Sequence, residues 1–406
     1  MISFENTENA FAYKSDAELK KARMLFRLMG SQFIVKTGAR MLPGMMKFKI
    51  PGTEWLVKKT IFSQFVGGET LEATKPVAAL LAQYQVQVIL DYGVEGGHNG
   101  EEGFDASTIE FIRVIENASQ QPSVPFMSIK LTGIVRFALL EKMDESMKVS
   151  AETTLMKKYI SVIENLSTAE KEEWKRVVER LRKICDKANE LNVGVLVDAE
   201  ETWIQDPVDA LTMMMMDVYN RRKAVVYNTI QLYRHDRLGF LKHSYQAAQE
   251  RNFILGVKLV RGAYMEKERL RAAEMGYPSP IQKDKPSCDA DYDAGVAFCL
   301  ERLKHISVMV ASHNELSNLK ATQIMDTLQI SHQHPHVHFS QLFGMSDHIT
   351  FNLAKKGFNV SKYLPFGPTR EVVPYLMRRA EENSSVSGQT GRELLLIKKE
   401  LKRRGL

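Results

Sequence analysis

The fold of this chain is best judged from a stretch near its end, Tyr363-Leu364-Pro365-Phe366-Gly367-Pro368. An apolar run ends there in a turn that contains proline and glycine, and the segment after it has the spacing of a helix. Four side chains at i, i+3, i+4 and i+7 share one face of that helix: Tyr375, Arg378, Arg379 and Glu382. Residue types alone favour a surface helix with an ion pair, although two adjacent guanidinium groups can also bind a planar carboxylate.

Working back from this stretch, seven further apolar runs alternate with helix-like segments, which is the pattern of a parallel α/β fold. With the last run included, they cover residues 86–93, 126–132, 193–200, 224–231, 254–261, 307–314, 337–342 and 360–365. A doubly wound sheet would need a glycine-rich first turn, but the sequence contains no GxGxxG or Walker motif. We therefore predict a (β/α)8 barrel of the TIM type, with a long insertion after the second run that includes a highly charged helical region at about residues 167–190.

Three segments are expected along the chain. Residues 1–70 form a helical, somewhat basic lead-in, with turns at Pro43-Gly44 and Pro51-Gly52. Residues 71–390 form the barrel. Residues 391–406 have the pattern of a basic amphipathic tail, for which a plain terminal helix and a membrane-surface helix are the alternatives.

Composition narrows the classes of protein to consider. The 406 residues are 44% hydrophobic with a net charge of +6, and no RNP box or zinc finger is present, so we expect no nucleic-acid partner. Three widely spaced cysteines fit a reducing compartment: Cys185, Cys288 and Cys299. Because the sequence shows no secretory signal, transit peptide or apolar run of ~18–20 residues, the expected location is cytoplasmic.

Polar residues close seven of the eight apolar runs, where the active site of such a barrel lies. They are Lys130, Asp198 with Glu200, Gln231, Lys258 with Arg261, His313 with Asn314, Gln341 and Tyr363. Because so many hydrogen-bonding and charged side chains converge on one rim of the predicted barrel, we expect a functional site there.

The roles of these groups stay open at the level of residue types. Asp198 and Glu200 stand two apart on a predicted strand and would face the same way, either as an acid/base dyad or as partners that neutralise and orient nearby cations. A lysine at a strand end could be a Schiff-base nucleophile, although carboxylates beside it would favour its charged form. Lys258, Arg261 and Gln231 form a donor-rich patch suited to an anion or to the polar edge of a flavin.

Two other patterns carry less weight. The histidines at 332, 334, 336 and 338 alternate, but Pro335 interrupts them and no acidic or cysteine partner is adjacent, so we expect no metal site. Residues 213–216 are four methionines in a predicted helix, and we interpret them as core.

Several segments resemble the proline dehydrogenase family in the right order. They are Lys130-Leu131-Thr132, residues 198–201, residues 257–264, residues 341–345 and the closing stretch 363–383. The resemblance covers about residues 85–390. It implies an FAD-dependent, distorted barrel whose last helix lies over the mouth, and oxidation of L-proline to Δ1-pyrroline-5-carboxylate by hydride transfer from C5 to flavin N5.

The resemblance also implies roles for individual residues. Arg378 and Arg379 are similar to a pair that binds the substrate carboxylate, with Lys130 beneath the substrate. Asp198 resembles a residue that forms a hydrogen bond with the tyrosine at the end of the barrel, here Tyr363. Glu382 resembles an acidic residue that holds the two arginines in place. The remaining implied positions are apolar walls at Tyr264, Leu342 and Tyr363, flavin contacts at Gln231, Lys258, Arg261, Gly262, His313, Asn314 and Gln341, and a gate acid at Glu95.

Two positions bear on how closely the family pattern is followed. Cys288 stands where the family often has a threonine, four residues before Tyr292, so a hydroxyl contact is not carried over. The hydroxyproline-oxidising branch tends to have a smaller serine at the position of Tyr363, which favours proline as the substrate. A hydroxyproline dehydrogenase, a Schiff-base lyase and a non-catalytic amino-acid-binding barrel are the alternative functions.

Partners follow from the same resemblance. Electrons are expected to pass to a membrane quinone, with peripheral contact at the inner membrane of a bacterium. A chain of 406 residues has no room for a second, aldehyde-oxidising domain, so we expect the product to be released or passed to a separate pyrroline-5-carboxylate dehydrogenase. No histidine is placed as a base, and the amine proton is expected to leave to solvent.

Overall fold

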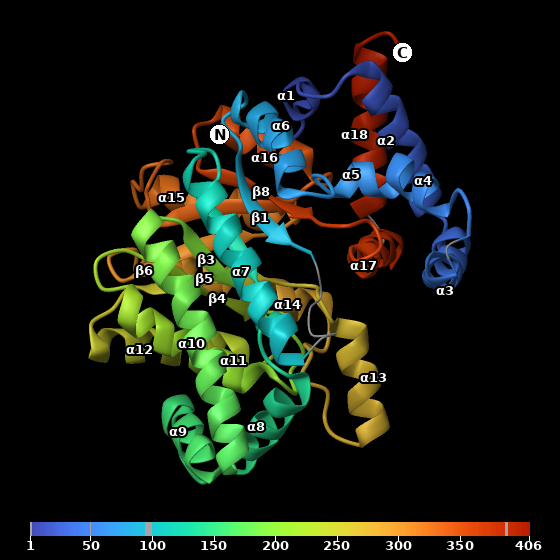
Figure 1. Ribbon diagram of the computed structural model, residues 1–406. Helices are drawn as coiled ribbons and strands as arrows, with labels where there is room; N and C mark the ends of the chain where they lie inside the picture. The colour runs from blue at the N-terminus through green and yellow to red at the C-terminus, as the bar shows by residue number, and fades with distance from the viewer. Residues whose placement is uncertain (1, 49, 94–99, 386–388) are drawn as a thin grey trace. The chain divides into compact units, whose positions relative to one another are not determined.

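Eight parallel strands close into a barrel in the order β1 to β8 (Figure 1). The computed structural model describes residues 2–48, 50–93, 100–385 and 389–406. The strands are β1 Gln87–Tyr92, β2 Phe126–Ile129, β3 Gly194–Val197, β4 Val226–Gln231, β5 Leu255–Val260, β6 Ile306–Ala311, β7 Val337–Leu342 and β8 Val360–Phe366. The predicted (β/α)8 architecture is confirmed. Several strands end before their apolar runs do, so the polar residues that close those runs lie in loops.

Helices connect the strands in the βα pattern. They are α6 Leu71–Ala82, α7 Gly100–Ser119, α8 Phe137–Val149, α9 Leu155–Asn165, α10 Thr168–Leu191, α11 Gln205–Tyr219, α12 Arg237–Arg251, α13 Met265–Met275, α14 Lys285–Leu300, α15 Glu315–Thr327, α16 Asp347–Lys355 and α17 Val373–Ser385. The insertion between β2 and β3 consists of α8, α9 and α10, and α10 confirms the charged helical region predicted at about residues 167–190. In α11, Met213, Met215 and Met216 are buried, which confirms their assignment to the core.

The start of α10 shows how the sequence sets a helix boundary. The Ser167 side chain accepts from the backbone N–H of Glu170, and the Glu170 carboxylate accepts from the backbone N–H of Ser167. This capping box satisfies N–H groups that have no partner within the helix. Trp174, Leu181 and Ala188 repeat every seven residues and are buried, so the charged helix still packs by one apolar face.

By internal contacts the chain divides into two compact units, Met1–Val94 with Phe339–Leu406, and Glu95–His338. The first unit holds the amino-terminal helices α1 Thr7–Phe11, α2 Asp16–Met29, α3 Gln32–Lys47, α4 Thr53–Val57 and α5 Ser63–Phe65, a π-helical turn at Lys58–Phe62, and the closing helices α17 and α18 Gln389–Arg403. The second unit holds β2 to β6 and their helices.

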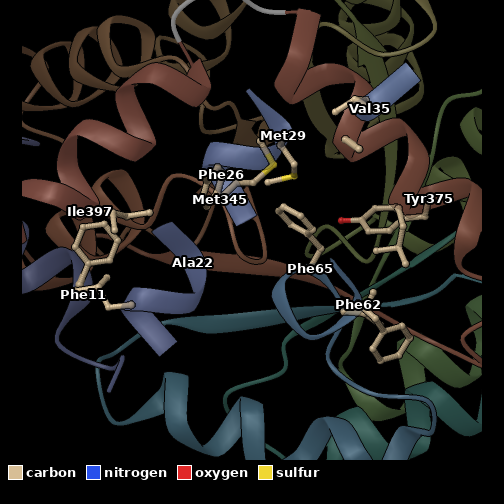
Figure 2. Packing of buried hydrophobic residues seen from close by; sticks show 14 of the residues in the cluster. Phe11, Ala22, Phe26, Met29, Val35, Phe62, Phe65, Met345, Tyr375 and Ile397 are labelled. Atoms are coloured by element: carbon tan, nitrogen blue, oxygen red, sulfur yellow. The ribbon is translucent and has the colours of Figure 1, made fainter. Parts of the chain in front are cut away.

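The first unit is organised around an apolar cluster to which the two ends of the chain both contribute (Figure 2). Phe26 of α2 and Phe65 of α5 meet edge to face, with ring centroids 6.3 Å apart. Leu376 of α17 and Ile397 of α18 are buried in the same cluster. The lead-in and the last two helices therefore share one core.

One predicted turn is wrong. The structure continues α3 through positions 43 and 44, where a Pro-Gly turn was expected. Proline removes one backbone hydrogen bond, but α3 keeps a buried face, with Val35 and Met46 both in the interior, and this packing holds the helix together. The turn at Pro51-Gly52 is confirmed, and Gly52 has the left-handed φ of 82°.

The last segment is a packed helix. Leu396, Ile397 and Leu401 of α18 are buried in the cluster of the first unit. Two of its cations are paired within the same unit: Arg404 lies 2.9 Å from Asp16, and Arg403 lies 2.8 Å from Glu400. The apolar residues on which a membrane-surface helix would depend are thus largely used in the protein core, with Leu395 as an exposed exception.

Among the described residues, no helix is both long enough and apolar enough to cross a bilayer.

Candidate active site

Side-chain alternation identifies the inner face of the barrel in the unit Glu95–His338. Asn228 of β4 donates to Asp209 of α11 at 2.9 Å, so it faces the helix layer. Because successive side chains alternate, Gln231 and Thr229 face the opposite, inner side. Thr229 is in register with Lys258 of β5, which places the Lys258 ammonium on that inner side as well.

Lys130 and Asp198 extend this inner face at the carboxyl ends of β2 and β3. Ile129, Val197 and Asn228 are in register on the outer side, so the residues that follow Ile129 and Val197 face inward. Lys130 keeps an extended backbone, and the Asp198 N–H continues the ladder to the Ile129 carbonyl at 2.8 Å. The Asp198 carboxylate forms an ion pair with the Lys258 ammonium. Asp198 thus contacts one of the cations that it was expected to neutralise and orient.

Glu200 departs from the predicted pairing with Asp198. Because β3 ends at Val197, Glu200 lies in the following loop, is buried, and accepts from the backbone N–H and the hydroxyl of Thr132 at 3.2 and 2.6 Å. Burial raises the pKa of the Glu200 carboxyl to about 7, against the opposing effects of the Lys130 charge and the Thr132 hydrogen bonds. The two carboxylates therefore have different partners, so the contacts do not support a dyad.

Gln231 is held by its neighbours at the end of β4. Its amide nitrogen donates to the Glu200 carbonyl oxygen at 2.7 Å and to the Tyr233 hydroxyl at 3.0 Å, and its amide oxygen accepts from Arg234 at 3.2 Å. The side chain is buried. These bonds give Gln231 a defined orientation, as a cofactor contact would need, but they also occupy both amide hydrogens.

Arg261 has partners that sequence reasoning missed. Its guanidinium donates to Asp289 at 2.6 Å and to the hydroxyls of Ser312 and Ser317 at 3.0 and 2.7 Å. It also lies over the Tyr292 ring, 4.1 Å from the centroid. Asp289 and Tyr292 are three residues apart in α14, which is the spacing of a shared helical face and the sequence signal that could have suggested these contacts.

The loop after β5 carries two left-handed residues at predicted contact positions. Gly262 has a φ of 94°, and Tyr264 has a φ of 56° at the start of α13. A bulky residue rarely adopts this conformation, and such strain is characteristic of functional loops. After β6, the Asn314 side chain caps α15 by accepting from the Ser317 N–H at 3.1 Å, and His313 beside it is half-buried.

In the unit that contains β7 and β8, two predicted apolar walls are adjacent. Leu342 and Tyr363 are in register on neighbouring strands, and both are half-buried. The next residue to Tyr363 on β8, Lys362, is fully buried and forms an ion pair with Asp347 of α16 at 2.8 Å. Because Lys362 faces α16, Tyr363 and Leu342 face the other, inner side of the sheet.

Gln341 does not share the inner face with Leu342. Its register partner is Lys362, and its amide oxygen accepts from the Thr350 hydroxyl of α16 at 2.8 Å. The side chain therefore points toward the helix layer. The family resemblance implied a flavin contact at Gln341, which also closes an apolar run, but a shift of one residue along a strand reverses the face.

The predicted clamp residues lie on α17. Arg379 is buried and Arg378 half-buried, and the Arg379 guanidinium lies 5.3 Å from the centroid of the Tyr375 ring one turn earlier. Tyr375 itself packs in the apolar cluster of its unit, so it does not belong to a polar helix face as predicted. Glu95 and the side chain of Glu382 lie outside the part of the chain that the structure describes.

The sequence profile that describes proline dehydrogenases matches residues 74–392. The chain belongs to the proline dehydrogenase family. Enzymes of this family are FAD-dependent flavoenzymes with a TIM-type barrel. The match spans all eight strands, and it includes every predicted contact residue.

Two relatives and one solved structure illustrate the likeness. The chain is 33% identical to proline dehydrogenase 1, mitochondrial, of Dictyostelium discoideum over 86% of its own length and 65% of that protein's length. It is 31% identical to hydroxyproline dehydrogenase of Xenopus laevis over 97% of its length and 88% of the relative's. Proline utilization A of Bdellovibrio bacteriovorus, inactivated by N-propargylglycine, superposes with a TM-score of 0.71 at 20% identity, covering 96% of this chain and 40% of that one.

Cys288, which stands where the proline dehydrogenase family often has a threonine, lies in an apolar environment. It packs in a small cluster with Tyr233 and Ile281, and its thiol lies 3.8 Å from the Leu232 carbonyl oxygen. Burial raises the pKa of the Cys288 thiol, although Arg261 opposes the shift. A neutral thiol fits this cluster without a hydroxyl's need for a strong hydrogen bond.

Proposed function

We propose that this chain is an FAD-dependent proline dehydrogenase that oxidises L-proline to Δ1-pyrroline-5-carboxylate. The family match over residues 74–392 carries the proposal, because it covers a barrel whose inner face bears Lys130 and Asp198 at the ends of β2 and β3 and Lys258 on β5. Charged groups gathered on the inner rim of a barrel mark the usual active-site position. Residues 71–390 are proposed as the catalytic domain.

The donor set near β5 and β6 fits a flavin dinucleotide. Arg261 offers guanidinium N–H groups held by Asp289, and Gly262 adopts a left-handed turn with open space where a side chain would stand. Lys258 supplies a buried cation, as suits the polar edge of an isoalloxazine. We propose that these three residues, with Gln231, His313 and Asn314, hold the cofactor. Gln341 is left out because its amide oxygen bonds to α16.

We propose that Arg378 and Arg379 bind the substrate carboxylate, with Lys130 as a further cation and Glu382 as a support. Leu342, Tyr363 and Tyr264 would enclose the apolar ring. Asp198 is proposed to bond Tyr363 and so to set the orientation of this wall. Such a clamp holds proline in one pose, which is the main requirement for transfer between two fixed centres.

The oxidation balances with these groups and a bound flavin. When bound, FAD accepts the hydride that leaves C5 of proline. The proline ammonium group loses one N–H proton to solvent before the transfer, and the iminium nitrogen loses the second afterwards, so the C5–N bond becomes the imine of the product. The proposed cations hold the substrate carboxylate in its charged form, so the amine is the group of proline that must lose a proton before the transfer. We therefore expect the rate of oxidation to rise with pH as the amine becomes neutral.

The test is direct. The purified protein should be yellow, and proline added without oxygen should bleach the flavin absorption. A colourless protein that borohydride traps together with its substrate would contradict the proposal and favour a Schiff-base lyase. A yellow protein that proline does not bleach would also contradict it.

Hydroxyproline is the second candidate substrate, since one relative is a hydroxyproline dehydrogenase. The hydroxyproline-oxidising branch tends to have a smaller serine at the position of Tyr363, so we expect the tyrosine ring to leave little space for a ring hydroxyl, which favours proline. The same anaerobic assay with trans-4-hydroxyproline separates the two. Faster bleaching by hydroxyproline than by proline would reverse the assignment.

We further propose that a membrane quinone accepts the electrons and that a separate pyrroline-5-carboxylate dehydrogenase uses the product. Both are implied by the family resemblance. The chemistry is compatible with them, because a reduced flavin needs an electron acceptor and the aldehyde in equilibrium with the imine can be oxidised further. The corresponding location is cytoplasmic with peripheral contact at the inner membrane of a bacterium.

A further inference from the structure

An apolar surface is exposed on α3 and α4, the helices drawn next to each other in Figure 1. Phe33 and Ile34 on α3 and Trp55 and Leu56 on α4 are exposed, Phe33 at 80% and Trp55 at 65% of their full accessible areas. Met41, Phe48 and Ile50 are exposed on the same segment. Contiguous exposed apolar residues on a folded protein mark a contact surface more often than chance. We call Phe33, Ile34, Met41, Trp55 and Leu56 the α3–α4 surface.

The helical geometry of α3 separates this surface from the protein core. At about 100° per residue, Phe33, Ile34 and Met41 lie within an arc of roughly 100°, and the buried residues Val35 and Met46 lie on the far side. Val35 belongs to the apolar cluster shown in Figure 2. Thus α3 has one apolar face that the protein buries and a second that it exposes. Packing within the chain explains only the first.

The charge around this surface indicates what covers it. Residues 20–59 contain ten lysines and arginines but one acidic residue, Glu54, so this stretch of sequence has a net charge of +9. Lys58 in this stretch is paired with Glu54 and with Glu69. The whole chain has a net charge of +6, so the remainder of the chain sums to −3. Lys36 and Arg40 are exposed and border the apolar arc of α3, and Lys59 is exposed just after α4. Cations that border exposed aromatic and aliphatic side chains are characteristic of helices that lie on anionic bilayers.

We propose that the α3–α4 surface docks this protein on an anionic lipid bilayer. A second copy of the chain fits less well, because a symmetric contact would bring two strongly positive surfaces together. The α18 tail also fits less well, because Leu396, Ile397 and Leu401 are buried and Arg404 is paired with Asp16. This inference rests on the proposed function, which includes peripheral membrane contact, and it names the surface that makes this contact. Its test measures vesicle binding and does not depend on proline oxidation.

Vesicle flotation tests the proposal with the full chain carrying its cofactor. We expect binding to vesicles made of equal parts phosphatidylcholine and phosphatidylglycerol, weaker binding as salt rises, and little binding to phosphatidylcholine alone. Changing Lys36→Gln and Arg40→Gln together should weaken binding about 25-fold, since each cation near an anionic surface contributes about fivefold. Phe33→Ser with Leu56→Ser should also reduce it.

Matched variants keep the test specific. Ile109→Ser with Leu316→Ser removes two equally exposed apolar side chains from the other unit and should leave binding unchanged. Leu395→Ser with Lys398→Gln alters the exposed part of α18 and should have little effect. If the tail variant loses binding and the α3–α4 variants keep it, or if the unmodified chain does not bind anionic vesicles, the proposal is overturned.

Tryptophan fluorescence gives a second readout that does not depend on mutating a contact charge. Trp55 is exposed, whereas Trp174 and Trp203, the other two tryptophans, are buried. Anionic vesicles should shift the emission to shorter wavelength, and Trp55→Phe should abolish the shift while the protein still floats. An emission that vesicles leave unchanged would contradict the proposal. Proline oxidation with a soluble dye acceptor should be equal in all these variants, so loss of binding is distinguished from failure of the proposed function.

Discussion

Arg379 is a buried cation beside an aromatic ring, and its proposed task is to bind a carboxylate. We expect Arg379→Met to raise the KM for proline roughly tenfold to a hundredfold, because a hydrogen bond to a charged group contributes about 1.5–3 kcal/mol. The flavin should remain bound. Steady-state kinetics and the flavin-to-protein absorbance ratio check both points.

Arg370→Met provides the control for this prediction. Arg370 lies just before α17, is exposed, and pairs with Glu54 at 3.2 Å. Its removal takes away the same charge from the same part of the chain without touching a buried group, so the KM should stay as it is. An unchanged KM in the Arg379→Met variant would contradict the proposed carboxylate-binding role of Arg379 and would indicate that α17 has only a structural role.

Glu200 makes folding stability depend on pH. Its pKa is raised from 4.5 to about 7 by burial, so the folded protein holds the proton more tightly than the unfolded chain does. The stability contributed by protonation is complete below the ordinary pKa and is lost as the pH rises through the raised one. We expect Glu200→Gln to reduce the loss of stability between about pH 5 and pH 8, by up to roughly 3 kcal/mol.

Urea unfolding of the two proteins across this range measures the difference. Glutamine keeps an oxygen that can accept from Thr132, so the variant is expected to fold. Parallel stability curves for the two proteins would show that Glu200 does not titrate in this window.

At the scale of elements, the loop between β5 and α13 has a left-handed backbone conformation that is unfavourable for residues other than glycine. Gly262 has a φ of 94°, so Gly262→Ala is expected to cost about 1–3 kcal/mol of unfolding free energy or to shift the loop. Because the loop bears Arg261 and Tyr264, we also expect weaker flavin retention during dilution. Urea unfolding and flavin release measure the two effects separately.

Gly239→Ala is the matched control. Gly239 lies in α12, and an added methyl group would meet no atom within 4 Å. The substitution should stabilise the protein by about 0.5–1 kcal/mol, since alanine is the better helix former. Equal effects at the two glycines would mean that the left-handed turn is not under conformational constraint.

At the scale of the whole molecule, residues from both ends of the chain build one core. Ile397 of α18 is almost fully buried in the cluster that also contains Phe11 and Phe26. We expect Ile397→Ala to lower the unfolding free energy by about 2–5 kcal/mol through lost burial and the cavity left behind. Chemical denaturation followed by circular dichroism gives the value.

Leu395→Ala, two residues away, tests whether position on the helix decides the effect. Leu395 is 56% exposed, and its replacement should change stability by less than about 0.5 kcal/mol. A large effect at Leu395 and a small one at Ile397 would contradict the described packing of α18.

Periodicity determined much of this protein from the sequence alone. Apolar runs of strand length recur between helical segments, so the eight strands and the helical insertion were predictable, and so was the position of Lys130, Asp198 and Lys258 at strand ends. These features depend on residues near one another in the chain. The family resemblance, carried by short motifs in order, is likewise a property of the sequence.

Tertiary structure decided the rest, because it depends on which distant groups meet. Packing by Val35 and Met46 kept α3 continuous through a Pro-Gly pair. One residue of strand register sent Gln341 toward α16 and Leu342 to the inner face. The end of β3 placed Glu200 in a loop with partners different from those of Asp198. The fold brought Asp289, Ser312 and Ser317 to Arg261. Packing buried one side of α18 and left one side of α3 exposed. A sequence states which side chains are apolar or charged, but only the fold decides which of them have lost water and which still face it.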